Sequence, residues 1–379
     1  MPTVAGVATT LLGYVTDQIE RGWTVTVACP PDSWLAAATT SAGAQVLSWP
    51  ATREPGPRIV DETVRLSRLV ASANPDVVHL HSAKAGLAGR LALRGDRPTV
   101  FQPHAWSFLA ATGTIRTASV RWERFAARWT DGLVCVSDGE KAAGLAHGVR
   151  ARTWVIPNGI DCTAWTPATG EDRAVARSRH GLPDRPLAVC IGRLCTQKGQ
   201  SDLLDAWHAV RREVPEAGLV LVGDGPDRAR LQTRADRMPG VLLAGERTDV
   251  ADWLAAANVV VVPSRWDGMA LVVLEAMARA RSVVATDVAG VLETLPRHAG
   301  AVVAVGDRTA LARELVVRLR DGRRADAEGA AGRKNVETAQ TKTAAAAAIV
   351  RVYQDLMGTR RPGRSLNAFA AASTAPSEG

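Results

Sequence analysis

Two carboxylates stand eight positions apart in the stretch SRWDGMALVVLEAMA, residues 264–278. Asp267 lies in a turn after the apolar run VVVVP (259–263), and Glu275 lies one turn into the helix expected next. Backbone N–H groups at the start of that helix would point into one crevice, with the positive end of the helix dipole behind them. They come from Gly268, Met269, Ala270 and Leu271. This arrangement favours a site for an anion or for hydroxyl groups.

Each of these carboxylates has a chemical and a structural explanation. Glu275 can accept hydrogen bonds from a pair of ribose hydroxyls, and Asp267 can accept them from a sugar beyond the phosphates. Alternatively, Asp267 compensates the helix dipole and Glu275 occupies a surface position. This pair of residues alone does not choose between the two explanations.

A basic loop, GRLCTQKG (192–199), follows the strand expected at LAVCI (187–191) and precedes an amphipathic helix. Loops beyond the carboxyl ends of parallel strands are where such folds bind ligands. Arg193 and Lys198 on this loop form an anion clamp that a diphosphate would fit. For a loop taken by itself, two solvated basic residues on a turn are the commoner case.

The elements that would carry these loops repeat along the chain as short apolar runs separated by amphipathic stretches. Continuously apolar strands alternating with helices indicate parallel sheets covered on both faces. One series of runs lies at 24–29, 76–81, 99–102, 132–137 and 153–156, and a second at 187–192, 218–223, 241–245, 259–263, 282–286 and 301–305. Because the pattern runs twice, we expect two doubly wound α/β domains.

The ends of the two domains follow from composition. Residues 157–186 are rich in proline, glycine and charge, which places the domain boundary near residue 165. We predict an N-terminal domain at 1–165 and a second domain at 166–340. An alanine-rich helix at 341–357 and a disordered tail at 358–379 would follow.

The N-terminal domain poses a problem, because the chain opens on a helix-like stretch (7–22) with no strand before it. The first strand of such a domain lies in the middle of the sheet, and its loss would leave backbone groups of both neighbours unpaired. Either the recorded start is too late, or this domain is compromised.

Composition excludes several classes of protein. The net charge of +8 favours anionic partners, but no zinc-finger spacing or RNP pattern accompanies it, so nucleic acid is not an expected partner. Five cysteines without a CxxC pair argue against a zinc site or a disulfide framework and suit a reducing compartment. No apolar run reaches the roughly 18 residues of a spanning helix, so we expect a soluble, cytoplasmic protein.

Together these motifs resemble those of the retaining glycosyltransferases of family 4, and the resemblance extends over nearly the whole chain. It implies the GT-B fold, two Rossmann-like domains facing a central cleft, here with the first strand of the N-terminal domain missing. In that family a G-R-x-x-x-x-K-G loop holds the donor diphosphate, and it is matched here by Gly192, Arg193, Lys198 and Gly199. An E-x7-E motif is matched by Asp267 and Glu275, which the resemblance assigns to the donor sugar and the ribose.

Two further donor positions and one departure follow from the resemblance. The stretch around Arg247 is similar to the segment that contacts the nucleobase, and Gly6 would approach the diphosphate. The first acid of the motif is usually glutamate. Asp267 is one methylene shorter, which changes its reach by about 1.5 Å and bears on the choice of donor.

Four residues of the N-terminal domain are candidates on the sugar and acceptor side. In FQPHAWSF (101–108), His104 resembles the family histidine that lies beside the donor sugar, although a histidine after a strand is more often a packing residue. The stretch VVHLHSAKAGLAGRLA (77–92) resembles the loop that faces the acceptor in the branch acting on polysaccharides and lipid-linked sugars. Its candidates are His81, Ser82 and Lys84, with an ordinary strand-to-helix turn as the alternative.

The activity implied is transfer of a sugar from a nucleoside diphosphate sugar, UDP rather than GDP, to a hydroxyl acceptor with retention of configuration. Arg193 and Lys198 would stabilise the departing diphosphate, and His104 and Asp267 complete the expected catalytic set. No metal or other cofactor is expected, in keeping with the lack of a D-x-D pair. The acceptor would belong to a cell-surface polysaccharide, a glycolipid or a glycosylated metabolite, and the protein would be a monomer or weak dimer.

Other interpretations stay open. A nucleotide-sugar isomerase of the related two-domain type would need no acceptor, and a degenerate nucleotide-binding protein would explain the missing strand and Asp267. Residues 114–132 interleave arginines with aromatic residues and could rest on the inner face of an anionic membrane. A core-facing stripe with a solvated face is the commoner explanation of such a pattern.

Overall fold

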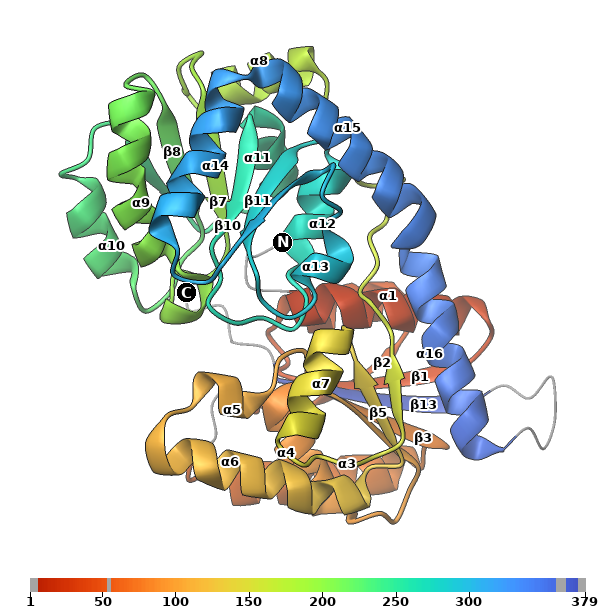
Figure 1. The fold of residues 1–379 in the computed structure, drawn as a ribbon. Helices are drawn as coiled ribbons and strands as arrows, with labels where there is room; N and C mark the ends of the chain where they lie inside the picture. Colours follow the sequence, from red (N-terminus) through yellow and green to blue (C-terminus); the bar gives the residue numbers. More distant parts are fainter. Residues whose placement is uncertain (1–5, 53–55, 359–365, 374–379) are drawn as a thin grey trace. The chain divides into compact units, whose positions relative to one another are not determined.

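The computed structural model describes residues 6–52, 56–358 and 366–373. The chain divides into two compact units, which we call the continuous unit (residues 159–341) and the split unit (5–158 together with 342–379). Each unit is a parallel sheet covered by helices (Figure 1). The predicted architecture of two doubly wound α/β domains is confirmed.

The continuous unit contains a six-stranded parallel sheet in the order β12-β11-β10-β7-β8-β9. Its strands are β7 (Leu187–Ile191), β8 (Gly218–Val222), β9 (Val241–Gly245), β10 (Val259–Val262), β11 (Ser282–Thr286) and β12 (Gly300–Val303). Its helices are α8 (Gly170–Arg179), η2 (Thr196–Lys198), α9 (Gln200–Glu213), α10 (Arg228–Ala235), α11 (Val250–Ala256), α12 (Leu271–Ala278), α13 (Val291–Thr294), α14 (Arg308–Arg320) and α15 (Gly322–Ala339). Two apolar clusters pack the helices against the sheet, one on each face.

The split unit contains a seven-stranded parallel sheet in the order β2-β1-β13-β3-β4-β5-β6. Its strands are β1 (Thr24–Cys29), β2 (Gln45–Ser48), β3 (Val77–His81), β4 (Thr99–Gln102), β5 (Gly132–Cys135), β6 (Thr153–Val155) and β13 (Asn367–Ala372). Its helices are α1 (Gly6–Glu20), α2 (Trp34–Ser41), α3 (Ile59–Ala73), α4 (Ser82–Leu93), α5 (Ser107–Ala110), α6 (Gly113–Ala126), η1 (Ala127–Trp129), α7 (Asp138–Ala146) and α16 (Lys342–Met357).

The central position of this sheet, which we expected to be empty, is occupied by β13. This strand pairs in parallel with β1 on one side and β3 on the other, so neither neighbour lacks a partner there (Figure 1). Phe369 is 1% exposed and joins the core beneath the sheet. The prediction of a disordered tail is therefore wrong for residues 367–372, while 359–365 and 374–379 lie outside the described residues.

The entry to β13 is fixed by a polar residue. Asn367 receives a hydrogen bond from the Asp76 backbone N–H at 2.8 Å, and its own N–H donates to the Asp76 carboxylate at 3.0 Å. The Asn367 side-chain amide donates to the Ala73 carbonyl at the end of α3. These bonds set the register in which Ala368 faces Val77.

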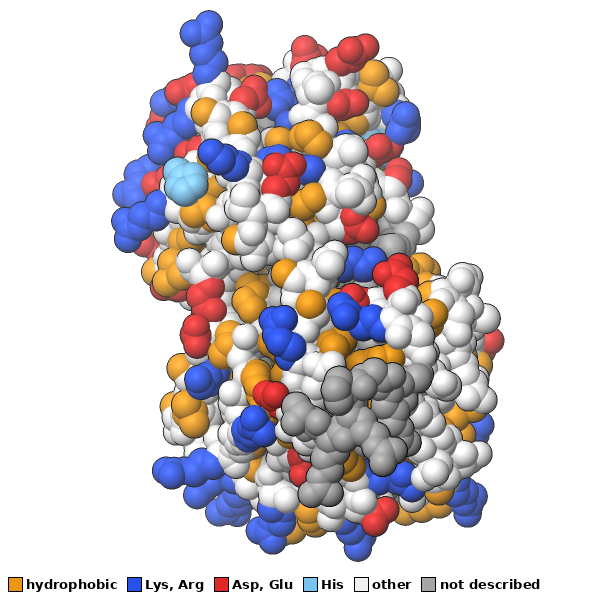
Figure 2. Space-filling model, turned by 90° about the vertical axis from the view of Figure 1, so that its right-hand side faces the viewer, with side chains coloured by type: hydrophobic (Ala, Val, Ile, Leu, Met, Phe, Trp, Pro, Cys, Tyr) orange, Lys and Arg blue, Asp and Glu red, His pale blue; other side chains and the backbone are white. Residues whose placement is uncertain are grey.

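The units also differ from the predicted domains at their ends. The compact units meet between residues 158 and 159 rather than near 165, and α16 belongs to the split unit, where it packs on α1. None of the described helices combines the length and the hydrophobicity needed to cross a bilayer. On the face drawn in Figure 2, basic side chains are interspersed with acidic ones and form no single continuous patch.

Candidate active site

Two loops at the carboxyl edge of the continuous sheet are held together by backbone contacts. The loop after β7 carries Gly199 in a left-handed conformation (φ 68°), and a Cβ there would lie 1.9 Å from the Pro263 carbonyl oxygen after β10. Only glycine allows this approach. The Arg265 N–H donates to the Gln197 carbonyl at 2.8 Å, and the Gln197 amide donates to the Trp266 carbonyl at 3.2 Å. The two sequence motifs therefore form one structural unit.

Lys198 and Asp267, one from each loop, form an ion pair with 2.5 Å between Nζ and Oδ2. The other oxygen of the Asp267 carboxylate accepts the Gly268 N–H at 3.1 Å, so Asp267 is fixed in the turn. Burial acts to lower the pKa of Lys198, but the charge and hydrogen bond of Asp267 outweigh it and raise that pKa. Lys198 is therefore held as a cation beside the turn that precedes α12.

Glu275 lies within electrostatic reach of the same lysine. Burial raises the pKa of Glu275 to about 7, and the positive charge of Lys198 opposes this shift. The N-cap residue of α12, Ala270, offers no side-chain cap to the helix N-terminus. A partial positive charge from the helix and a full one from Lys198 thus lie beside two carboxylates.

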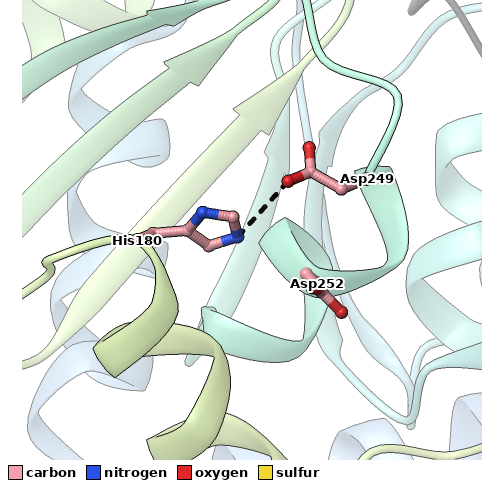
Figure 3. A group of neighbouring side chains, drawn as sticks. All are labelled: His180, Asp249 and Asp252. Carbon is pink, nitrogen blue, oxygen red and sulfur yellow. Dashed lines mark ion pairs between the residues drawn. The ribbon is translucent and has the colours of Figure 1, made fainter.

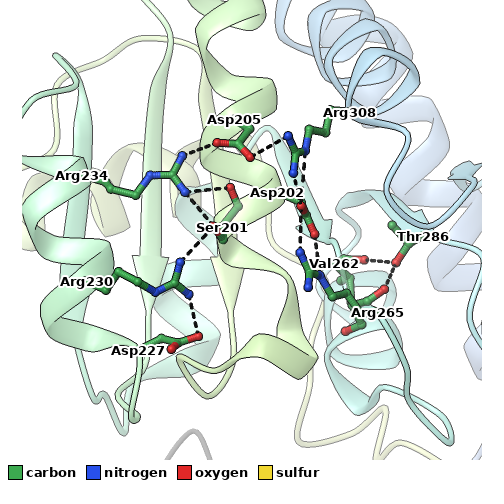
Figure 4. Close-up of polar contacts among 11 residues, drawn as sticks. Ser201, Asp202, Asp205, Asp227, Arg230, Arg234, Val262, Arg265, Thr286 and Arg308 are labelled. Carbon is green, nitrogen blue, oxygen red and sulfur yellow. Dashed lines mark hydrogen bonds and ion pairs between the residues drawn. The ribbon is translucent and has the colours of Figure 1, made fainter. Parts of the chain in front are cut away.

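Arg193 differs from the other arginines around this edge of the sheet. Among the described residues, nothing forms a hydrogen bond or ion pair with its guanidinium group, and the side chain is partly buried. Arg265, by contrast, donates to Asp202 at 2.7 Å, and Arg308 donates to the same carboxylate at 2.9 Å (Figure 4). Within the described part of the chain, the Arg193 guanidinium therefore has no protein partner that a ligand would have to displace.

The paired arginines form a scaffold beneath the loops. Figure 4 shows Arg230 and Arg234 reaching from α10 to the hydroxyl of Ser201 at the start of α9. Arg234 also binds Asp205, and Arg230 binds Asp227 at 2.9 Å. These contacts tie α9 to α10 and fix the helix that follows the basic loop. Sequence analysis did not single out this scaffold.

The remaining donor-side candidates lie farther out. Arg247 is exposed, donates to the Ala244 carbonyl at 3.1 Å and lies over the Trp253 ring at 5.6 Å. Gly6 is the exposed first residue of α1 in the split unit. No ligand role of either residue is tested by these positions, and both stay predictions.

A histidine and two aspartates missed by sequence analysis come together near Arg247: His180, Asp249 and Asp252 (Figure 3). His180 stacks on Trp253 with ring centroids 3.9 Å apart, and burial lowers its pKa. Asp249 accepts the indole N–H of Trp253 at 3.1 Å, and Asp252 is paired with Arg179. Because both carboxylates already have partners, we assign this group to the packing of α8 against α11.

In the split unit, the expected acceptor-side residues separate into two environments. Lys84 is 1% exposed and forms an ion pair with Glu62 at 2.6 Å. The ion pair ties α4 to α3, and a contact of Lys84 with an acceptor stays a prediction. Ser82, at the start of α4, is partly exposed and has a φ of 74°.

His81 and His104 lie together at the ends of the neighbouring strands β3 and β4. His81 Nδ1 and His104 Nε2 are 3.0 Å apart, and the rings stack at 5.4 Å. His79 lies 3.9 Å from the ring of His81 and bonds the Tyr353 hydroxyl of α16 at 2.7 Å. Burial lowers the pKa of His79 and His104 to about 3 and that of His81 well below its usual value. All three imidazoles are therefore neutral near pH 7.

The backbone around this histidine cluster is strained. Ser82, His104 and Ala105 have φ angles of 74°, 57° and 147°, which side chains other than glycine rarely adopt. Each such residue costs about 1–3 kcal/mol and persists only where its surroundings impose it. Trp106, which directly follows Ala105, is 1% exposed and donates to the Glu140 carbonyl at 2.7 Å, so the end of this loop is anchored in the core.

Comparison with known proteins assigns the family. Residues 4–164 match Glycosyltransferase Family 4, and residues 185–321 match Glycosyl transferases group 1. A GDP-mannose-dependent alpha-(1-6)-phosphatidylinositol monomannoside mannosyltransferase of Mycobacterium tuberculosis is 33% identical over 328 residues, covering 80% of this chain and 81% of that protein. The chain belongs to glycosyltransferase family 4.

Another relative and a solved structure add to this comparison. The UDP-Gal:alpha-D-GlcNAc-diphosphoundecaprenol alpha-1,3-galactosyltransferase of Escherichia coli is 28% identical, covering 60% of this family 4 chain and 62% of its own length. The crystal structure of Anabaena Alr3699/HepE in complex with UDP-glucose superposes with a TM-score of 0.80 at 21% identity, covering 92% of this chain and 96% of that one. The fold is therefore GT-B, as the motifs implied.

Proposed function

We propose that this chain transfers a sugar from a nucleoside diphosphate sugar to a hydroxyl acceptor, with retention of configuration and without a metal ion. The observation that carries the proposal is the contact between Lys198 and Asp267, which joins the two predicted donor motifs in one site. The relatives support this class, since their names describe sugar transfer from UDP-Gal or GDP-mannose.

The proposed chemistry starts with departure of the diphosphate. Negative charge then develops on the leaving phosphate, and Arg193, Lys198 and the N-terminus of α12 can stabilise it. In the free protein the positive charge of Lys198 is balanced by Asp267, so the donor must share or displace that contact. Asp267 would then bind hydroxyls of the donor sugar and Glu275 those of the ribose.

The acceptor is the less defined substrate. The relatives act on a phosphatidylinositol mannoside and on a sugar linked to diphosphoundecaprenol, both of which are lipid-linked. We propose a lipid-linked or polysaccharide hydroxyl for this chain, with Ser82 as a candidate contact of the acceptor in the split unit. The isomerase and the non-catalytic alternatives are not favoured, because the relatives are named as transferases.

A lipid-linked acceptor would favour peripheral membrane contact, and α6 has the surface for it. Ile115 is 71% exposed and Phe125 is 42% exposed. Arg121, Arg124 and Arg128 are exposed on the same segment, and the Arg128 guanidinium lies 3.9 Å from the centre of the Phe125 ring. Apolar and cationic side chains combined in this way bind anionic bilayer surfaces.

The proposal is tested by a transfer assay on the purified chain. UDP- and GDP-sugars are offered with lipid-linked and soluble acceptors, with and without EDTA, and the anomeric configuration of the product is read by NMR. We expect acceptor-dependent release of nucleoside diphosphate, a product with the configuration of the donor, and no loss of rate with EDTA. An inverted product or a rate abolished by EDTA would contradict the proposed mechanism.

A further inference from the structure

The contact between two imidazoles in the split unit carries an inference beyond the donor site. His81 is the last residue of β3 and is 1% exposed, while His104 lies two residues beyond the end of β4. Because β3 and β4 are paired in parallel with His81 opposite Gln102, the two side chains meet at the same edge of the sheet. Their nitrogens lie 3.0 Å apart.

We propose that His81 is a positioning residue, whose Nδ1 hydrogen bond holds the His104 imidazole in one tautomer and one orientation. This rests on the proposed function and on the expectation that His104 belongs to its catalytic set. It replaces our expectation that His81 itself contacts the acceptor. Because His81 is buried and forms a hydrogen bond with His104, its role would be to support the His104 imidazole.

The hydrogen bond couples the tautomers of the two rings. A neutral imidazole carries one N–H and one lone pair, so the bond between His81 Nδ1 and His104 Nε2 needs a proton on one of these nitrogens and not on the other. Whichever nitrogen holds it, the state of the remaining His104 nitrogen, Nδ1, is then determined. A proton on His81 Nδ1 therefore goes with an N–H at His104 Nδ1, and a lone pair on His81 Nδ1 goes with a lone pair there.

The surroundings of His81 leave the ring little freedom to turn. His79 covers one side at 3.9 Å between ring centroids, and the Tyr14 ring lies at 6.1 Å. His79 is itself held by the Tyr353 hydroxyl at 2.7 Å. On the other side, the loop that carries His104 is anchored by the buried Trp106. The His81 ring is therefore a fixed support against which His104 rests, despite the strained φ of 57° at His104.

The test compares two substitutions of the full chain. His81→Asn keeps a polar group near the position of Nδ1, whereas His81→Leu removes it at similar volume. Long-range proton–nitrogen NMR spectra of the histidine-labelled protein report the tautomer of each imidazole, and the His104 signals are identified by their absence in His104→Gln. Steady-state kinetics with the active donor and acceptor pair give kcat and KM.

We expect wild type and His81→Asn to show one His104 tautomer, and His81→Leu to show an average of two. The expected loss of kcat in His81→Leu is about 10- to 100-fold, because a misplaced group near the reacting atoms costs that much. His81→Asn should recover most of it, with the KM for the donor nearly unchanged in both variants.

Tyr353→Phe is the matched control, because it removes the neighbouring hydrogen bond to His79 and leaves the His81 contact in place. It should lower the melting temperature and keep both the single His104 tautomer and the kcat. The inference is overturned if His81→Leu keeps the wild-type His104 signals, or if Tyr353→Phe changes them as much. If the wild type transfers no sugar, the proposed function fails, and the NMR comparison still decides the role of His81.

Discussion

The two units share one architecture but are assembled and charged in different ways. The sheet of the continuous unit comes from a single stretch of chain between residues 187 and 303, and its candidate site consists of charged groups on two adjoining loops. The split unit takes its central strand from residues 367–372, and its histidine cluster is neutral and largely buried. Sequence motifs identified candidate residues in both units, but the ion pair between the two loops and the contact between the two histidines are seen only in the folded chain.

The largest expected effect comes from removing β13. Ending the chain after Gly358 deletes the strand that joins β1 to β3 and exposes the core around Phe369. We expect the split unit to lose cooperative unfolding while the continuous unit keeps its own transition, as followed by calorimetry and limited proteolysis. The milder Phe369→Ala should cost about 3–5 kcal/mol. A truncated chain that melts as the full one does would show that β13 does not complete the sheet.

Lys198→Ala tests the charged site with a smaller effect. It removes a cation held at 2.5 Å from Asp267 and leaves that carboxylate without its partner. Since a hydrogen bond to a charged group contributes about 1.5–3 kcal/mol, nucleotide affinity should fall roughly 10- to 150-fold. Lys334→Ala, at an exposed position of α15, is the matched control and should bind as the wild type does in calorimetric titration. If nucleotide affinity fell equally in both variants, Lys198 would have no specific role in nucleotide binding.

Glu275 should make the stability of the continuous unit depend on pH. Burial raises its folded pKa from 4.5 to about 7, so the folded state binds more protons than the unfolded state between these values. The free energy of unfolding should therefore fall as pH rises from about 4.5 to 7, by at most ~1.4 kcal/mol per pH unit, and level off above. Glu275→Gln should flatten this slope in denaturant titrations at several pH values. An unchanged slope would mean that Glu275 does not titrate in this range.

The smallest effect is expected for Asp267→Glu. The longer side chain moves its carboxylate by about 1.5 Å toward a bound sugar, while a charge opposite Lys198 is kept. We expect the ratio of kcat/KM between two donor sugars to change by less than about tenfold, with stability preserved. Rates measured with a panel of donors check this. If Asp267→Glu lowered activity as much as Lys198→Ala does, the main role of Asp267 would be its ion pair with Lys198 rather than a contact with the sugar.

Most of the fold could be predicted from apolar runs, because β-branched residues mark strands such as VVVV at 259–262. The strand β13 could not, since NAFAAA is rich in alanine, which favours helices, and its surroundings resemble a polar tail. Its strand conformation is imposed by pairing with β1 and β3, which only the folded chain provides. The short β2 was missed for the opposite reason, since QVLS is too short and too exposed to give a pattern.

The candidate site could be predicted in part. The motif identified Lys198 and Asp267, but it could not show that they touch, or that Arg193 is left without a partner among the described residues while Arg265 is paired. The ion pair of Lys84 could not be predicted, because its partner Glu62 lies on another helix and carries no signal in the local sequence. The contact of His81 with His104 follows from the pairing of β3 with β4. These strands follow one another in the chain, so their pairing could have been predicted from the sequence.

The central claim, that the loops after β7 and β10 bind a nucleoside diphosphate, is tested most directly by calorimetric titration of the full chain with UDP and GDP side by side. The account predicts saturable binding of one of them with one site per chain. Absence of binding for both nucleotides, in a protein that melts cooperatively, would contradict the claim.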